Sequence, residues 1–353
     1  MFATKLTPIR RNLLAWYEKN KRDLPWRMTS DPYAIWISET MLQQTQVKTV
    51  IPYYEKFLKT FPTVAALNQA PLRQVLRLWS GLGYYRRAEN LKMAARVIMH
   101  EHGGTIPPDY GKLRALPGVG EYTAGAVLSI AFQKTYPAVD SNVRRVLDRV
   151  FNLGDAAKLR IMAQRLVPRW QPGNFNQSLM ELGASICLPS EPRCLLCPLA
   201  RHCLSHRENS TKKTAARRKL NFKSVTWPLA IVRRGEKILL RRRPTPGLLA
   251  GLWEFPGGEK TARDSVVATT RRQLEELGAT LRSQRRVGEI RHNITYRRIR
   301  SPIFLIEVPA DESIDLPASR WRWVTPAALQ RYPLSSMTVK AAKVLASYEK
   351  SSS

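Results

Sequence analysis

The first two hundred residues follow a helical pattern, in which apolar side chains recur every three or four positions from Leu6 to His206. Asp31 before Pro32 predicts a helix start, because aspartate can cap free N–H groups and proline suits the first helical position. We therefore expect a helix over 33–44 and an all-α domain over 1–206. A second apolar stripe consists of Val47, Val50, Ile51, Tyr54, Leu58 and Phe61.

The pattern changes after this stretch. Residues 207–224 are rich in lysine and arginine and poor in apolar side chains, which predicts an exposed basic linker. Beyond it, short runs rich in Ile, Val and Leu predict strands, and 264–277 predicts a helix that ends at Gly278. With 353 residues there is room for two domains, and we expect a second, α+β domain over 225–348. The predicted strands cover 228–232, 237–240 and 299–308.

The charge balance points to a polyanionic partner. Fifty-eight Lys and Arg against 27 Asp and Glu give a net charge of +31, while 44% hydrophobic residues is ordinary for a globular protein. Nucleic acid is the most common polyanion, and its binding would weaken strongly with salt. A basic protein without a specific partner stays an alternative. Since no stretch of about 18 apolar residues and no signal peptide is visible, we expect a cytoplasmic protein that is associated with the nucleoid and not with a membrane. We also expect a monomer.

The four cysteines form one tight group. Cys187, Cys194, Cys197 and Cys203 have the spacing C-x6-C-x2-C-x5-C, and disulfides are rarely kept in the cytosol. Clustered thiols there indicate metal ligands. A structural zinc site is one alternative, although zinc motifs more often contain two close pairs and only Cys194 and Cys197 form such a pair.

A glycine-containing turn joins two predicted helices near residue 118. Gly118 and Gly120 flank Val119, so the backbone can turn tightly, and N–H groups at the next helix start can bind a phosphate. A plain helix–helix turn is the alternative. The sequence LPGVGEYTA over 116–124, together with the cysteine spacing, resembles the iron–sulfur branch of the helix-hairpin-helix DNA glycosylases, the endonuclease III and MutY families. The resemblance implies a [4Fe–4S] cluster on the four cysteines and double-stranded DNA as partner.

Position 122 separates two activities within these families. Endonuclease III-like enzymes have a lysine there, whose amine attacks the sugar and forms the Schiff base needed for strand cleavage. Tyr122 cannot form that imine. A monofunctional glycosylase is therefore expected, and an endonuclease III-like glycosylase/AP lyase for oxidised pyrimidines is the alternative.

Hydrolysis of a purine N-glycosidic bond needs an acid to protonate the base and an anion to stabilise the sugar cation. Glu39 and Asp140 match MutY positions, and the resemblance implies that Glu39 protonates adenine N7 and that Asp140 stabilises or traps the cation. Apolar neighbours of Glu39 would raise its pKa by burial. The alternatives are an exposed helical glutamate and an aspartate that only caps a helix.

Further positions match residues that contact the flipped nucleotide in the family. Base flipping leaves a gap that inserted side chains fill, and Gln44 and Tyr84 resemble the intercalating residues. Arg27, Asn142 and Glu181 match positions that contact adenine or the active-site water.

The second domain resembles a degenerate Nudix fold, as MutY C-terminal domains do. The pattern begins at Gly257, but Arg263 and Arg272 replace glutamates that would hold Mg²⁺, so pyrophosphate hydrolysis is not expected. Many MutY proteins read 8-oxoguanine with a Phe-Ser-His loop, where this chain has 294–296, Ile-Thr-Tyr. Thr295 keeps the hydroxyl at the middle position.

Together these features predict release of adenine paired with 8-oxoguanine, or with guanine, in duplex DNA. The resemblance extends from Ile9 to Tyr348. Two alternatives from other functional classes remain: a DNA-binding protein without catalytic activity, and a Nudix hydrolase.

Overall fold

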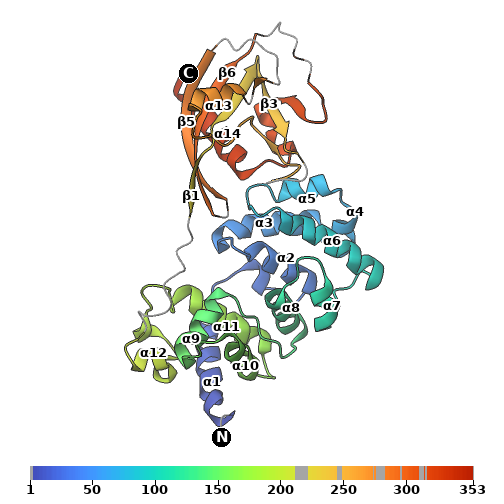
Figure 1. The fold of residues 1–353 in the computed structure, drawn as a ribbon. Coiled ribbons are helices and arrows are strands. Elements are labelled where there is room, and N and C mark those ends of the chain that lie inside the picture. Colours follow the sequence, from blue (N-terminus) through green and yellow to red (C-terminus); the bar gives the residue numbers. More distant parts are fainter. Residues whose placement is uncertain are drawn as a thin grey trace. The chain divides into compact units, whose positions relative to one another are not determined.

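The computed structural model describes residues 3–210, 222–244, 249–272, 274–275, 283–294, 296–309, 314 and 316–352. The chain divides into two compact units (Figure 1). One consists of Met1–Ala70 and Glu89–Arg218, and the other consists of Pro71–Ala88 and Lys219–Ser353. None of the described helices is long and apolar enough to cross a membrane.

The first unit is helical, as expected. One part of its core lies between α1, α9, α10 and α11, and another lies where α2 packs on α3 and α8. The cysteine-rich segment follows α11 and contains two short 3₁₀ helices, Cys194–Leu196 and Ala200–His202. The α-helices are α1 (Ala3–Asn20), α2 (Pro32–Leu42), α3 (Val47–Thr60), α4 (Val64–Gln69), α6 (Arg86–Glu101, whose first turn belongs to the second unit), α7 (Tyr110–Ala115), α8 (Glu121–Phe132), α9 (Ser141–Phe151), α10 (Ala156–Leu166), α11 (Pro172–Ser185) and α12 (Leu204–Arg207).

Helix α2 begins where the sequence predicted. Asp31 caps it, since one carboxylate oxygen accepts a hydrogen bond from Tyr33 N at 3.0 Å, and Pro32 is the first helical residue. The helix ends at Leu42, two residues before the predicted end, because Gln44 takes a left-handed φ of 58°. Every residue from Tyr33 to Met41 is buried, including the polar Ser38, Glu39 and Thr40.

The stripe predicted around residue 50 forms one face of α3. Val50, Tyr54 and Phe61 of that stripe are buried in the core of the first unit. The sequence from Val47 to Phe61 is therefore correctly interpreted as an amphipathic helix that packs one face inward.

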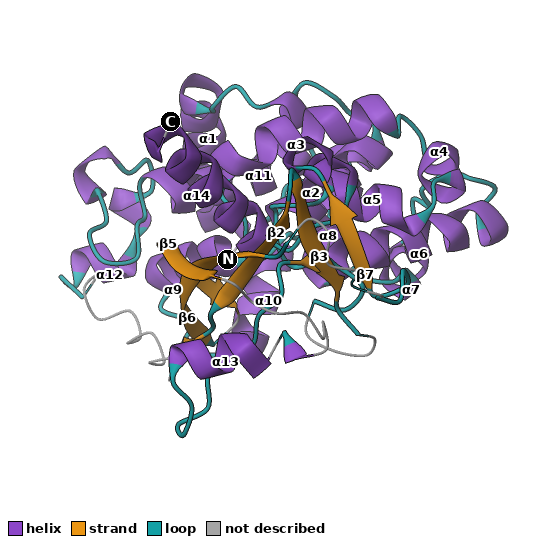
Figure 2. Cartoon of the chain, turned by 90° about the horizontal axis from the view of Figure 1, so that it is seen from above, coloured by secondary structure: helices purple, strands orange, loops and turns teal. Residues whose placement is uncertain are grey.

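The second unit is built around a mixed sheet (Figure 2). Strand β6 pairs in parallel with β1 and β2 and antiparallel with β5, and β3 pairs antiparallel with β2, β4 and β7. The predicted strands are confirmed, with ends that differ by one or two residues. The strands are β1 (Lys223–Thr226), β2 (Leu229–Arg234), β3 (Lys237–Arg242), β4 (Trp253–Glu254), β5 (Ser283–Ile294), β6 (Arg297–Glu307) and β7 (Trp321–Val324).

Helices cover both faces of this sheet. Helix α14 (Ser336–Ser352) buries Met337, Ala341 and Leu345 against one face, and α13 (Val266–Arg272) lies on the other (Figure 2). Alternate residues of β2 point to the two faces, with Ile231 in one cluster and Val232 in the other.

Three details differ from the predicted boundaries or lie beyond what the structure describes. Helix α13 covers Val266–Arg272 within the predicted 264–277, of which 273 and 276–277 lie outside the described residues, as does Gly278. Strand β1 begins at Lys223, inside the stretch predicted as linker. The sequence also did not predict β1, β4, β5 or β7, because β4 has two residues and β5 is rich in arginine rather than apolar.

Residues 71–88 contribute helix α5 (Leu72–Leu78) and the loop that follows it to the second unit. The hydroxyls of Ser80 and Tyr85 both donate to the carbonyl oxygen of Leu334, at 2.9 and 2.5 Å. Two donors on one carbonyl fix the loop at this point.

Candidate active site and cysteine cavity

Glu39 is buried in the middle of α2, with 5% of its surface exposed. Burial raises the pKa of its carboxyl to about 7, because the charged form loses its hydration there. The hydrogen bond from Tyr122 lowers this pKa and the negative charge of Asp140 raises it, and both effects are smaller than that of burial. The exposed helical glutamate that we considered from the sequence is therefore wrong, and Glu39 can carry a proton near neutral pH.

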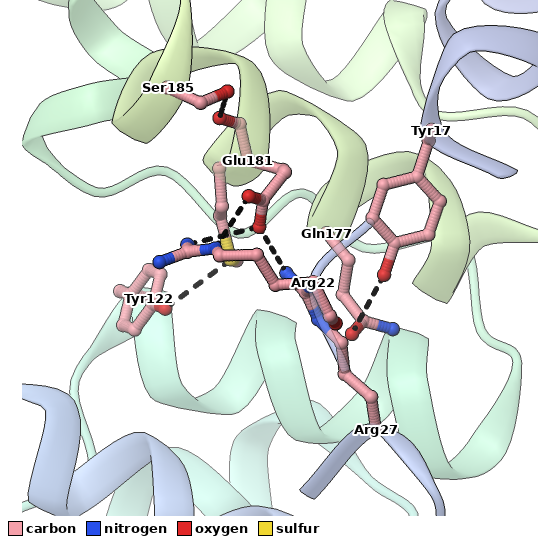
Figure 3. A network of polar contacts seen from close by, with 8 residues as sticks. Tyr17, Arg22, Arg27, Tyr122, Gln177, Glu181 and Ser185 are labelled. Atoms are coloured by element: carbon pink, nitrogen blue, oxygen red, sulfur yellow. Dashed lines mark hydrogen bonds and ion pairs between the residues drawn. The ribbon is translucent and has the colours of Figure 1, made fainter. Parts of the chain in front are cut away.

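Tyr122 lies in the first turn of α8 and points toward Glu39. Its hydroxyl donates to Oε2 of Glu39 at 2.5 Å and lies 3.6 Å from the sulfur of Met180 on α11. Figure 3 shows the contact with the sulfur. Burial and the charge of Glu39 raise the pKa of the phenol well above its usual value, so Tyr122 stays a donor.

Asp140 caps α9, as the sequence allowed. One of its carboxylate oxygens accepts from Val143 N at 2.7 Å, and the other accepts from the side-chain amide of Asn142 at 3.1 Å. The negative charge of Asp140 raises the pKa of both Glu39 and Tyr122, so Asp140 lies near enough to both for its charge to act on them. Asp140 thus caps α9 and also acts with its charge on Glu39.

Arg145 links Asn142 to the cysteine-rich segment. Its guanidinium donates to Oδ1 of Asn142, to Gly183 O and to Cys187 O, each at 2.8 Å. Helices α9 and α11 approach closely here, and a Cβ on Gly183 would lie 2.7 Å from that of Asn142. Only glycine therefore allows this approach.

Glu181 is held by two arginines rather than left open. It lies on α11 with 2% of its surface exposed, and it accepts from Arg22 at 2.6 and 3.0 Å and from Arg27 at 2.7 Å. Figure 3 shows both guanidinium groups pointing at this carboxylate. The guanidinium of Arg27 also lies over the ring of Tyr17. The structure thus joins Arg27 and Glu181, as the sequence suggested, and adds Arg22.

The predicted hairpin turn is present between α7 and α8. Gly118 has a left-handed φ of 78°, and a Cβ there would lie 2.7 Å from Cβ of Asn90. Gly120 has an extended backbone with φ −85°, and a Cβ there would meet nothing within 4 Å. The turn itself therefore requires a glycine at position 118, whereas Gly120 leaves open space beside the first turn of α8, and its expected contact with a phosphate stays a prediction. Val119 between them is buried.

The predicted intercalating residues have strained backbones and exposed side chains. Gln44 and Tyr84 have φ values of 58° and 49°, and both are exposed. Tyr84 belongs to the second unit, so it is described with that unit and not with Glu39. Thr295 lies outside the described residues, and its neighbour Tyr296 is exposed.

All four cysteines are free and line one cavity. Burial raises the pKa of Cys197 to about 11, so binding of a metal group would have to displace protons. Among the described residues, which include these four, no three His, Cys, Asp or Glu side chains are placed to hold a single metal ion. Four thiols around one cavity are a donor set of the kind that binds zinc or an iron–sulfur cluster.

Arg149 lies against this cavity and is almost fully buried. One of its guanidinium nitrogens donates to Sγ of Cys187 at 3.3 Å and to Leu188 O at 2.6 Å, and the other donates to Pro189 O at 2.8 Å. Arg149 thus places a positively charged donor against this sulfur. The donor set and its cationic neighbour are thus suited to a group bound by thiolates.

Sequence reasoning missed several residues of this region. Arg22, Arg145 and Arg149 are three of many arginines in a strongly basic chain, and Met180 is an ordinary apolar position of helix α11. Helix α9 also contains Arg144, but Arg145 and Arg149 are four residues apart, a spacing that places both on one face of the helix and was the available signal.

Comparison with known proteins supports the same two-part organisation. A family model described as HhH-GPD superfamily base excision DNA repair protein matches residues 37–172, and one described as NUDIX domain matches residues 228–343. Both matches confirm the predicted fold classes.

Among curated proteins, the adenine DNA glycosylase of Rattus norvegicus is 37% identical over 90% of this chain and 74% of its own length. That of Homo sapiens is 33% identical over 96% and 74%. A solved thermostable thymine-DNA glycosylase is 33% identical with a TM-score of 0.55, covering 58% of this chain and 98% of its own. An endonuclease III–DNA complex, at 21% identity and a TM-score of 0.51 over 59% of this chain and 99% of its own, shares the fold. The chain therefore belongs to the adenine DNA glycosylase (MutY) family of base excision repair, with a helical HhH-GPD domain followed by a NUDIX domain.

Proposed function

We propose that this adenine DNA glycosylase removes adenine paired with 8-oxoguanine, and also with guanine, from duplex DNA and leaves an abasic site. The observation that carries the proposal is the buried Glu39, which accepts a hydrogen bond from Tyr122 at 2.5 Å and whose pKa is raised to about 7, in part by the charge of Asp140. One carboxyl group that holds a proton beside a second carboxylate is the arrangement that glycosidic bond hydrolysis requires.

The reaction would use these two side chains in sequence. Glu39 donates its proton to N7 of adenine, and the bond between C1′ and N9 breaks with its electron pair going to the base. Asp140 faces the positive charge that develops on the sugar. Water then adds its oxygen to C1′, and its proton leaves to a carboxylate, so that free adenine and an abasic sugar result. We assign the orientation of adenine and water to Arg27, Asn142 and Glu181.

Tyr122 supports a monofunctional enzyme. Its phenol is a buried donor to Glu39 and carries no amine, so it cannot form an imine with the sugar. Treatment with borohydride should therefore leave no covalent adduct with DNA and no strand cleavage coupled to base release. A trapped adduct accompanied by strand cleavage would support the endonuclease III-like glycosylase/lyase instead.

We assign a [4Fe–4S] cluster to Cys187, Cys194, Cys197 and Cys203. Such a cluster, when bound, supplies four iron–thiolate bonds that fasten the segment between α11 and α12. Arg149 supports this assignment because it is buried and donates to Cys187 Sγ. Iron and acid-labile sulfide analysis of the purified protein tests it, and one zinc per chain without iron would contradict it.

We assign recognition of the base opposite adenine to the NUDIX domain. We propose contact with 8-oxoguanine for Thr295, which follows β5 in the sequence and precedes the exposed Tyr296. Nucleotide hydrolysis is not proposed for this domain. Arg272, one of the residues that replace Nudix glutamates, forms an ion pair with Asp264 at 2.5 Å.

The test is a base-release assay on duplexes that carry adenine opposite 8-oxoguanine, guanine, cytosine or thymine. Release should be fastest opposite 8-oxoguanine, slower opposite guanine and weak opposite the pyrimidines. Glu39→Gln should abolish release while duplex binding is retained. Substantial turnover by that variant would refute the assigned acid, and binding without release by the unchanged protein would favour a DNA-binding protein without activity.

A further inference from the structure

The loop that carries Tyr84 is held in a strained shape. Tyr84 has a φ of 49°, which L residues other than glycine rarely adopt, and its two glycine neighbours Gly81 and Gly83 have φ values of 105° and 76°. The Tyr84 side chain is 45% exposed. Glycine adopts positive φ readily, so Tyr84 is the strained residue of this loop, and contacts are needed to hold it in this conformation.

Arg87 supplies such contacts from the first turn of α6. Its guanidinium donates to Gly83 O at 3.1 Å and more weakly to Leu82 O at 3.5 Å, and its backbone N–H donates to Tyr84 O at 2.9 Å. The guanidinium carbon lies 5.6 Å from the centre of the Tyr84 ring. Arg87 thus contacts the ring of Tyr84, its carbonyl and the carbonyl before it.

Trp79 completes the arrangement. It is fully buried, its indole N–H donates to the same Gly83 O at 3.1 Å, and its ring lies 5.3 Å from the guanidinium carbon of Arg87. The guanidinium therefore contacts two aromatic rings, one buried and one exposed. Burial lowers the pKa of Arg87 to about 10, which leaves it charged near neutral pH.

We infer that Arg87 is a positioning residue that sets Tyr84 in the shape in which its ring enters the duplex when the target base leaves the stack. This rests on the proposed function and on the expectation from the sequence that Tyr84 fills the gap left by the flipped nucleotide. A side chain already in place loses less conformational freedom on binding than one that must be ordered. The ring is exposed for insertion while the strained backbone beneath it is fixed by the buried cation.

A double-mutant cycle tests whether Arg87 acts through Tyr84. Wild type, Arg87→Met, Tyr84→Ala and the double variant are compared by the single-turnover rate of adenine release opposite 8-oxoguanine. A second readout is the fluorescence of a 2-aminopurine placed beside the target adenine, which rises when stacking is broken. Both measurements use a saturating concentration of the whole protein, so that a weaker affinity for DNA does not change either value.

Arg87→Met should lower the release rate and the fluorescence change about tenfold, because a hydrogen bond from a buried cation is lost. The double variant should be no slower than Tyr84→Ala. Effects of the two substitutions that multiply, or no effect of Arg87→Met beside a clear effect of Tyr84→Ala, would overturn the inference. No effect of Tyr84→Ala would instead show that the proposed role of Tyr84 is wrong, and the inference would fall with it.

Three further variants separate positioning from folding and charge. Arg86→Met removes the same charge from an exposed neighbour and should change neither readout at saturation. Arg87→Lys keeps the charge but lacks the planar fork, so it should restore only part of the rate. Should Arg87→Met fail to fold, as judged by its melting temperature, Trp79→Phe keeps the ring and removes the donor to Gly83. It should lower both readouts severalfold, and unchanged readouts would count against the inference.

Discussion

The hydroxyl of Tyr122 donates to Oε2 of Glu39 at 2.5 Å, across 83 residues of sequence. This bond favours the charged form of Glu39 and so lowers its pKa, against the larger opposite effect of burial. Tyr122→Phe should therefore raise the pKa of Glu39 above about 7 and move the alkaline limb of the pH profile of base release to higher pH. Single-turnover rates across the pH range measure this, and a limb that moves to lower pH would contradict the assigned acid.

Replacement of Glu39 by glutamine should stabilise the protein most at alkaline pH. The pKa of Glu39 is about 7 in the folded protein and 4.5 as its ordinary value, so its proton favours folding below pH 4.5 and this contribution is lost as pH rises through 7. The free energy of unfolding falls by about 3 kcal/mol over this pH range. Melting temperatures at about pH 5 and pH 8 should show the advantage of the variant growing with pH, and a constant difference would argue against the raised pKa.

Asp140 should tolerate asparagine structurally but not catalytically. Asparagine can still accept from Val143 N, whereas alanine would remove the cap at a cost of about 1 kcal/mol. Loss of the negative charge should lower the pKa of Glu39 and the rate of base release. Unfolding measurements beside rates distinguish the two effects. A fully active Asp140→Asn protein would show that the charge is not used.

The two glycines of the hairpin should respond differently to alanine. Gly118→Ala places a Cβ 2.7 Å from that of Asn90 at a φ of 78°, and should cost more than 1 kcal/mol of stability. Gly120→Ala meets open space and should leave the melting temperature unchanged, yet weaken duplex binding severalfold if a phosphate approaches there. Equal effects of the two substitutions on stability would contradict this difference.

Replacement of Arg27 and of Arg22, the two arginines that bond to Glu181, should lower the stability of the protein by different amounts. Arg27 is 11% exposed and Arg22 is 46% exposed, and solvent screening weakens the exposed ion pair. Arg27→Met should therefore cost about 2 kcal/mol of stability and reduce base release strongly, whereas Arg22→Met should cost less than about 1 kcal/mol. Denaturant titrations of both variants measure this. A larger loss for Arg22→Met would show that its two hydrogen bonds outweigh its exposure.

Much of the local structure was predictable from the sequence. Asp31 and Asp140 each cap the helix that follows them, and the strand pattern after residue 228 was found at the expected places. These features depend on neighbours within a few residues, where hydrogen-bonding geometry and apolar spacing act directly. The left-handed glycine at 118 belongs to the same class.

Family motifs gave candidate residues of the site, but only the tertiary structure decided their environment. Burial of Glu39 depends on α8 and Tyr122, and the partner of Glu181 that the sequence did not reveal, Arg22, lies 159 residues away. Asn142 is joined to the cysteine cavity by an arginine indistinguishable in sequence from its many neighbours. Such pairings arise because packing brings distant segments together and removes water from between them. That change of solvent, which no local pattern encodes, turns an ordinary glutamate into an acid that holds its proton near neutral pH.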